Sequence, residues 1–133
     1  MKLLLDTHAW IWAQETPEKF GRRATALLQD TANGVFISSM AAMELARLTF
    51  LRRVQLAEPA SAWIADSIRS LAAHSLDVTA QIAAEAYELP GTFHKDPIDR
   101  VLVATARLHN LTLLTADHLI LKYPHVKSLR ATA

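Results

Sequence analysis

The sequence has no cysteine, few glycines and no long apolar run. The absence of cysteine excludes disulfide bonds, thiolate metal sites and a cysteine nucleophile, and it fits a reducing compartment. The three glycines, Gly21, Gly34 and Gly91, cannot build a dinucleotide-binding fingerprint or a phosphate-binding P-loop. The longest uncharged run, residues 31–43, has 13 residues, whereas a membrane-spanning helix needs roughly 20. Asp6 interrupts the N-terminal leucines before a secretory segment could form. We therefore expect a cytoplasmic protein without a membrane segment.

The sequence also lacks a strong net charge. Fourteen Lys and Arg residues against thirteen Asp and Glu residues leave a formal net charge of +1. This balance does not by itself indicate a nucleic-acid-binding protein, although the charges could still be segregated in space. Hydrophobic residues make up 51% of the 133 residues, which is enough for one core. We expect a single domain over residues 1–133.

Strand-like and helix-like segments alternate along the chain. The predicted strands are residues 2–5, 35–38, 74–78, 112–115 and 126–129, the last at the edge of a sheet. The predicted helices are residues 8–14, 17–29, a long helix from an N-cap at Ser39 to about residue 53, and residues 59–71, 79–88 and 97–110. This alternation indicates an α/β fold in which helices cover both faces of a mostly parallel sheet.

Four acidic residues lie at the ends of apolar stretches: Asp6, Glu44, Asp99 and Asp117. Two of them follow predicted strands, and the other two lie early in helices that leave the same edge of the sheet. Ligand sites of parallel sheets lie beyond the carboxyl ends of the strands, so we expect the four side chains to share one crevice. Carboxylates that converge in this way repel one another unless a divalent cation neutralises them. The pattern therefore points to a metal site.

Each acid also has a purely structural interpretation. Asp6 could cap the following helix, Glu44 could pair with Arg47 one helical turn along, and Asp117 could form a turn. In Asp96-Pro97-Ile98-Asp99, Asp96 is a good N-cap, Pro97 suits the first helical position, and an acid at position 99 favours the helix dipole. Any one acid is weak evidence for a metal site. The stronger evidence is that all four are expected at the same edge of the sheet.

Histidines and basic residues near these acids are further candidates. His8, His94 and His118 could line the pocket, while His74, His109 and His125 are expected at the surface or packed as polar residues. Lys95 and Arg100, and at another helix end Arg52 and Arg53, could hold phosphate groups. No histidine pair has the spacing of a zinc-hydrolase helix. The tryptophans, Trp10, Trp12 and Trp63, are expected in the core or an interface.

Four segments together resemble the acidic motifs of PIN-domain nucleases, and in length and spacing the chain resembles the VapC-type toxins of toxin–antitoxin pairs. The segments are Leu-Leu-Leu-Asp6-Thr7-His8, Ser38-Ser39-Met-Ala-Ala-Met-Glu44-Leu, His94-Lys-Asp96-Pro-Ile-Asp99-Arg100, and Leu-Leu-Thr115-Ala-Asp117. The likeness covers nearly the whole chain.

The resemblance implies an α/β/α sandwich with a five-stranded parallel sheet and hydrolysis of RNA with Mg²⁺ or Mn²⁺. Asp6, Glu44, Asp99 and Asp117 fall on the family's metal-binding and catalytic acids. Asp96 belongs to the Asp-Pro-x-Asp-Arg variant of one branch of the family and is a further candidate for metal contact. Thr115 and Thr7 would support the acids, and His94, Lys95 and Arg100 would contact the substrate.

The implied partners are a cognate antitoxin and a second copy of the chain in a homodimer. The apolar faces of the helices around Trp10 and Trp63 offer more surface than a small domain needs, so we expect one of them to be covered by such a partner.

Two rival classes are less well supported by the sequence. A phosphatase of the haloacid-dehalogenase type requires a second aspartate two positions after Asp6, where His8 stands. A non-catalytic PIN-like interaction module that binds a partner protein or RNA is the other alternative. All four acids are present, so the usual mark of an inactive site is missing.

Overall fold

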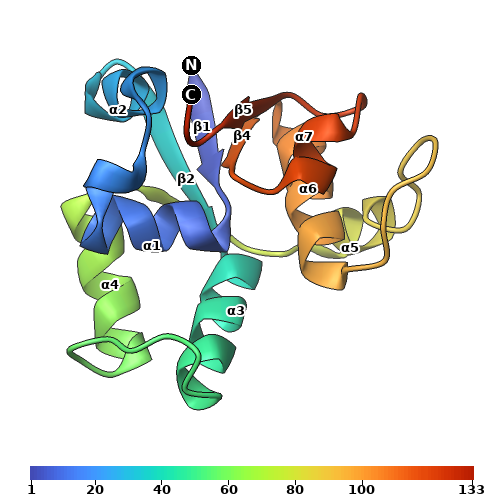
Figure 1. Cartoon of the computed structure of the whole chain (residues 1–133). Coiled ribbons are helices and arrows are strands. Elements are labelled where there is room, and N and C mark those ends of the chain that lie inside the picture. The colour runs from blue at the N-terminus through green and yellow to red at the C-terminus, as the bar shows by residue number, and fades with distance from the viewer.

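An all-parallel sheet of five strands forms the centre of the computed structural model, which describes residues 1–133 (Figure 1). The strand order is β3-β2-β1-β4-β5, and β1 is central, with Leu4 in register between Phe36 of β2 and Leu113 of β4. The strands are β1 (Lys2–Leu5), β2 (Gly34–Ser38), β3 (His74–Leu76), β4 (Thr112–Thr115) and β5 (Ser128–Arg130).

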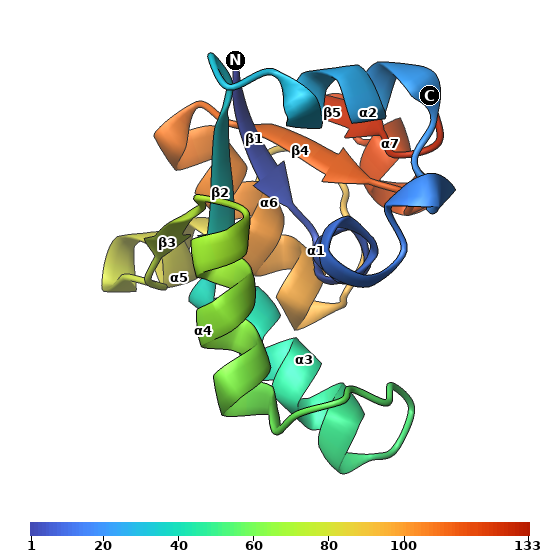
Figure 2. The same ribbon diagram turned by 90° about the vertical axis from the view of Figure 1, so that its left-hand side faces the viewer.

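Helices connect the strands and cover both faces of the sheet. They are α1 (Thr7–Glu15), α2 (Arg22–Gln29), α3 (Ser39–Phe50), α4 (Ala60–Ser70), α5 (Ala80–Glu85), α6 (Pro97–His109) and α7 (His118–Lys122), with a short 3₁₀ turn at Pro17–Lys19. In Figure 1, α1, α2 and α4 lie on one side of the sheet and α5, α6 and α7 on the other. Figure 2 shows that α3 and α4 extend past the carboxyl edge of the sheet.

The core lies in two layers, one on each face of the sheet. Leu4 and Leu113 belong to the layer under α5, α6 and α7, whereas their neighbours Leu5 and Leu114 belong to the layer under α1, α2 and α4. Because side chains alternate between the faces of a strand, a strand buried on both sides is continuously apolar. The predicted three-layer α/β/α sandwich with a five-stranded parallel sheet is therefore confirmed.

The tryptophans of α1 and α4 pack against each other within the chain. The ring centroids of Trp10 and Trp63 are 5.3 Å apart, and their exposed fractions are 0% and 4%. Trp10 Nε1 donates to Ser67 Oγ at 2.6 Å, and Trp63 Nε1 donates to Glu15 Oε1 at 3.1 Å. Trp10 and Trp63 therefore lie in the core, in agreement with the sequence, because each helix covers the tryptophan of the other, and the partner contact expected for these faces stays a prediction.

Several local expectations differ from the structure, and β3, α3 and α5 end earlier than predicted. The predicted helix over residues 17–29 is divided at Phe20 and Gly21, and the first amides of α2 donate to the carbonyl of Ala133. A Cβ at Gly21 would lie 2.2 Å from that carbonyl oxygen, so only glycine fits there. Ser38 rather than Ser39 caps α3. The helix α7 was not predicted, and β5 begins two residues later than expected.

No helix of the structure is both long enough and apolar enough to cross a membrane.

Candidate active site

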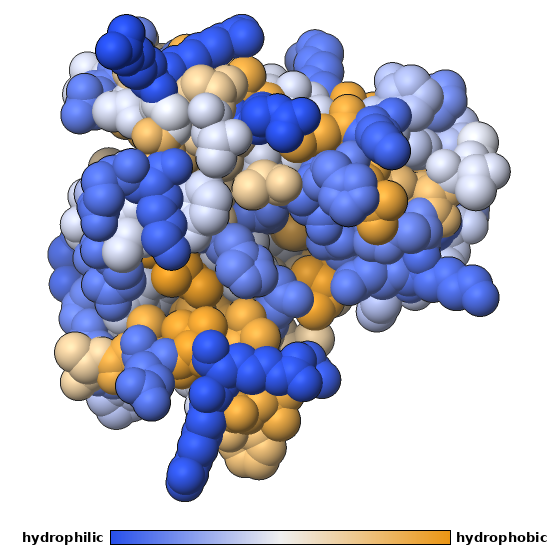
Figure 3. All heavy atoms as spheres, in the orientation of Figure 1, coloured by the Kyte–Doolittle hydropathy of each residue, from blue (hydrophilic) through white to orange (hydrophobic).

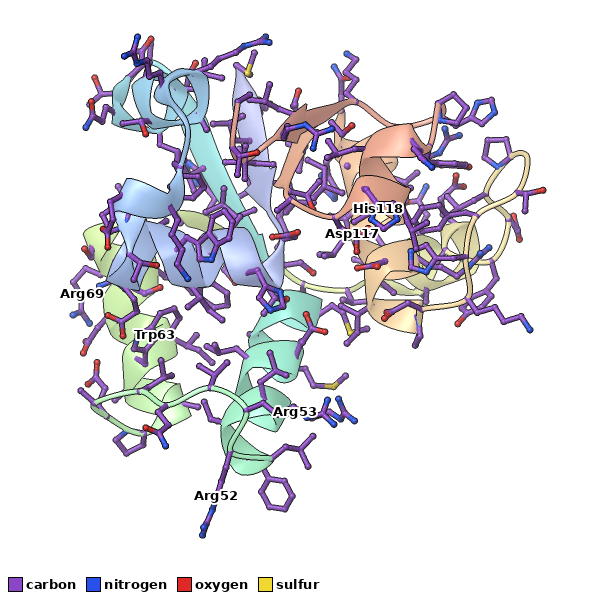
Figure 4. All side chains as sticks on the ribbon, in the orientation of Figure 1. Arg52, Arg53, Trp63, Arg69, Asp117 and His118 are labelled. Atoms are coloured by element: carbon purple, nitrogen blue, oxygen red, sulfur yellow. The ribbon has the colours of Figure 1, made fainter.

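A cavity of about 300 Å³ lies beyond the carboxyl ends of β1 and β4, and five acidic side chains line it. We call it the acidic cavity. Its lining residues are Asp6, Thr7, His8, Glu44, Asp96, Asp99, Leu102, Ala116 and Asp117. The structure thus brings the four predicted acids together with Asp96. Figure 4 labels Asp117 at the start of α7, facing the space between α1 and α6.

Asp6 is fixed by hydrogen bonds on both carboxylate oxygens. It follows β1 directly, is 8% exposed and caps α1 by accepting the amide of Ala9 at 2.7 Å. The hydroxyl of Thr115 donates to the other oxygen of Asp6 and accepts the amide of Asp117 at 2.9 Å. Thr115 therefore links the ends of β1 and β4, and the two aspartates keep a fixed relation.

Asp96 and Asp117 are both helix N-caps. Asp96 accepts the amides of Ile98 and Asp99 at the start of α6, as the Asp-Pro pair predicts. Asp117 Oδ1 accepts the amides of Leu119 and Ile120 at the start of α7. An N-cap uses one oxygen for the helix, so both side chains have an oxygen left for the cavity. Capping and ligand binding are compatible at both positions.

Glu44 and Asp99 reach the cavity from the early turns of α3 and α6. Glu44 is half-buried and forms no ion pair with Arg47, so its structural interpretation is not supported. The Asp99 side chain is 19% exposed, and its Oδ2 lies 3.1 Å from His94 Nε2.

Burial and mutual repulsion raise the pKa of two acids in this cluster. Burial is the main cause that raises the pKa of Asp99 from 3.8 to about 7. The negative charges that add to this rise are, in decreasing order, those of Asp96, Asp117, Glu44 and Asp6. Burial also raises the pKa of Asp6, while hydrogen bonds from Thr115 and Ala9 oppose that rise. The cavity is thus a site where negative charge is concentrated and poorly compensated by the protein.

The donor groups of the cavity suit a hard divalent cation. Carboxylate oxygens are the ligands that Mg²⁺ prefers, and the buried hydroxyl of Thr7, 1% exposed, has no hydrogen-bond partner. No three of the acidic or imidazole groups are placed closely enough to form a complete ligand set. Mg²⁺ usually keeps several waters and takes only one or two carboxylates directly, so a site without three close protein ligands can still hold it.

One of the predicted substrate contacts, Arg100, has different surroundings from those expected, whereas the role of Lys95 stays a prediction. The guanidinium of Arg100 donates from Nε to the carbonyl of Ala86 at 2.8 Å and from Nη1 to those of Phe93 and His94 at 3.0 Å each. Arg100 therefore fastens the loop before α6, a role that its sequence position did not reveal. Lys95 is exposed and forms no hydrogen bond or ion pair.

Of the remaining histidine and arginine candidates, some line the acidic cavity and others do not. His8 lines the acidic cavity, whereas His118, labelled in Figure 4, is exposed and is not among the lining residues. Arg52 and Arg53 follow the C-terminal end of α3 and do not line the cavity either.

The arrangement of the sheet and the acidic cavity corresponds to a known class of protein. Residues 3–126 match the model of the PIN domain. The chain therefore belongs to the PIN-domain family, as the acidic motifs predicted.

Similar proteins agree with this assignment. The chain is 32% identical over 125 residues to ribonuclease VapC22 of Mycobacterium tuberculosis, covering 92% of each protein. Its fold is similar to that of a chain in the DNA-bound VapBC2 complex of Rickettsia felis, with a TM-score of 0.70, 18% identity and 98% of each chain covered. The DNA-bound VapBC structure of Salmonella typhimurium gives a TM-score of 0.69, 21% identity and the same coverage.

Proposed function

We propose that this chain is a metal-dependent endoribonuclease and the toxin of a toxin–antitoxin pair. The observation that carries the proposal is the acidic cavity, where five carboxylates face one space at the carboxyl edge of the sheet. The relative VapC22 bears the name ribonuclease and matches 92% of this chain, which supports RNA as the substrate.

Asp6, Glu44, Asp99 and Asp117 are the side chains that would hold Mg²⁺ or Mn²⁺, with Asp96 beside them. When bound, the cation stabilises charge on the scissile phosphodiester and lowers the pKa of a coordinated water. The hydrogen bonds of Thr115 and Ala9 hold the Asp6 carboxylate in place and oppose the rise in its pKa that burial causes. Burial, together with the charges of the neighbouring acids, raises the pKa of Asp99, so a bound cation would favour its ionised form.

The proposal includes an antitoxin and a second copy of the chain as partners. The structural relatives include VapBC complexes, which supports the antitoxin. Apolar side chains are exposed along α3 and at its C-cap: Met43 at 58%, Phe50 at 84% and, at the cap, Leu51 at 40%. Figure 3 shows hydrophobic side chains gathered over the lower part of the molecule, where α3 and α4 lie. An exposed apolar patch of this kind is typical of an interaction surface.

The activity is tested with the purified chain and a single-stranded RNA. We expect cleavage in Mg²⁺ or Mn²⁺ and none in excess EDTA, with activity restored when the metal is returned. Cleavage that continues in EDTA would contradict the metal mechanism. RNA binding without cleavage under every metal condition would instead favour the non-catalytic interaction module.

A further inference from the structure

Asp99 differs from the other aspartates of the acidic cavity in how its carboxylate is held. Asp6, Asp96 and Asp117 each accept at least two hydrogen bonds from backbone amides or from Thr115. The Asp99 carboxylate accepts none, and its one close polar contact is His94, with Nε2 3.1 Å from Oδ2. His94 is therefore the close polar neighbour of the Asp99 carboxylate.

The contacts of the His94 imidazole favour one tautomer. The amide of Asp96 donates to His94 Nδ1 at 3.4 Å, and a ring nitrogen that accepts carries no hydrogen. The hydrogen of the neutral ring is then on Nε2, the atom that faces Asp99. Nε2 is buried and has no hydrogen-bond partner, and its short polar contact is with Asp99 Oδ2. A buried N–H of this kind has one acceptor within reach, the Asp99 carboxylate.

The loop that carries His94 is fastened at several points. Arg100 Nη1 donates to the carbonyls of Phe93 and His94, and the Tyr123 hydroxyl donates to the carbonyl of Pro90. The ring of Phe93 packs between those of His94 and Tyr123, at centroid distances of 4.4 and 4.8 Å. A segment without regular structure is thereby held so that one imidazole stays beside Asp99.

We propose that His94 is a positioning residue, whose Nε2–H orients the Asp99 carboxylate through Oδ2 and leaves Oδ1 for a divalent cation. The proposal rests on the proposed function, and it gives His94 a different task from the substrate contact expected from the sequence. Partners that orient a metal ligand typically affect metal affinity by 10–100-fold when they are removed.

The test is calorimetric titration of the full chain with Mn²⁺. His94→Phe keeps a ring against Phe93 but removes the donor, and His94→Gln keeps an N–H donor. His125→Phe is the matched control, because His125 packs on Tyr123 in the same aromatic cluster and forms no contact with Asp99. Thermal melts without metal verify that each variant is folded.

We expect the Kd for Mn²⁺ to rise about 10–100-fold in His94→Phe, to recover in large part in His94→Gln, and to stay unchanged in His125→Phe. At saturating Mn²⁺, RNA cleavage by His94→Phe should return toward that of the parent, because the donor acts on metal binding. Parental Mn²⁺ affinity in folded His94→Phe would overturn the role of His94 alone. Equal weakening in His94→Phe and His94→Gln would also overturn it, since the donor would then be irrelevant. Failure of the parent chain itself to bind Mn²⁺ would overturn the metal site and this inference together.

Discussion

Replacing Asp99 with asparagine should stabilise the metal-free protein, and only above a certain pH. The folded chain holds the pKa of Asp99 at about 7, against an ordinary value of 3.8. Below pH 3.8 the carboxyl is protonated in both states, so it costs no stability. As the pH rises from the ordinary pKa to the folded one, the unfolded chain releases a proton that the folded chain retains, and stability falls. The cost is complete above a pH of about 7, and the Asp99→Asn substitution would remove it.

The size of this effect follows from the difference in pKa. A difference of about 3 between the two states corresponds to about 4 kcal/mol. The Asp99 side chain remains 19% exposed, and halving the figure for solvent screening gives about 2 kcal/mol. An unfolding entropy of ~2.1 cal/mol/K per residue over 133 residues converts this to a rise in Tm of about 7 °C.

Thermal unfolding in EDTA at pH 8 and at pH 4 measures the effect. The control is Asp77→Asn, because Asp77 is exposed and forms no hydrogen bond or ion pair. We expect Asp99→Asn to raise Tm at pH 8, to change it little at pH 4, and to differ from the control only at pH 8. A Tm at pH 8 equal to or lower than that of the parent would refute the account of repelling, desolvated carboxylates.

Two further predictions concern hydrogen bonds that hold the site and the core. Thr115→Val should lower the free energy of unfolding by about 1–3 kcal/mol, because it removes the hydrogen-bond partner of Asp6 and of the Asp117 amide. Urea denaturation measures this loss, with Thr112→Val on the same strand as the control. Equal losses in the two variants would contradict a stabilising role for these hydrogen bonds. Trp10→Phe should cost a similar amount by leaving the buried Ser67 hydroxyl unpaired, and removal of that hydroxyl in Trp10→Phe with Ser67→Ala should recover part of the loss. A double variant no more stable than Trp10→Phe would show that the hydroxyl is not the cause.

Local sequence patterns were sufficient for the sheet and for the position of the acids. The apolar runs that end in Asp6 and Asp117 give strands β1 and β4, and the carboxyl edge of a parallel sheet then brings the two acids together. The Asp96-Pro97 pair gives the start of α6 because both residues act within one helical turn. These features depend on contacts between near neighbours or on a general property of parallel sheets.

Contacts between distant residues explain what the sequence did not reveal. The predicted helix over residues 17–29 is divided because the first amides of α2 donate hydrogen bonds to the carbonyl of Ala133, which is distant in sequence. The tryptophan faces of α1 and α4 looked unpartnered because their mutual packing joins residues 53 positions apart in sequence, Trp10 and Trp63. From the sequence, Arg100 was expected to bind phosphate. Its guanidinium instead binds backbone carbonyls outside regular helices and strands, and no sequence pattern predicts such contacts.

RNA cleavage by Asp99→Asn across a Mn²⁺ titration tests the central claim most directly. The asparagine side chain keeps the size of aspartate but removes one negative charge from the acidic cavity. We expect a protein that is at least as stable as the parent at pH 8 and yet cleaves RNA at least about 100-fold more slowly at every Mn²⁺ concentration. Asp77→Asn should cleave like the parent. Parental cleavage by Asp99→Asn would contradict the claim that these carboxylates form the metal-dependent active site.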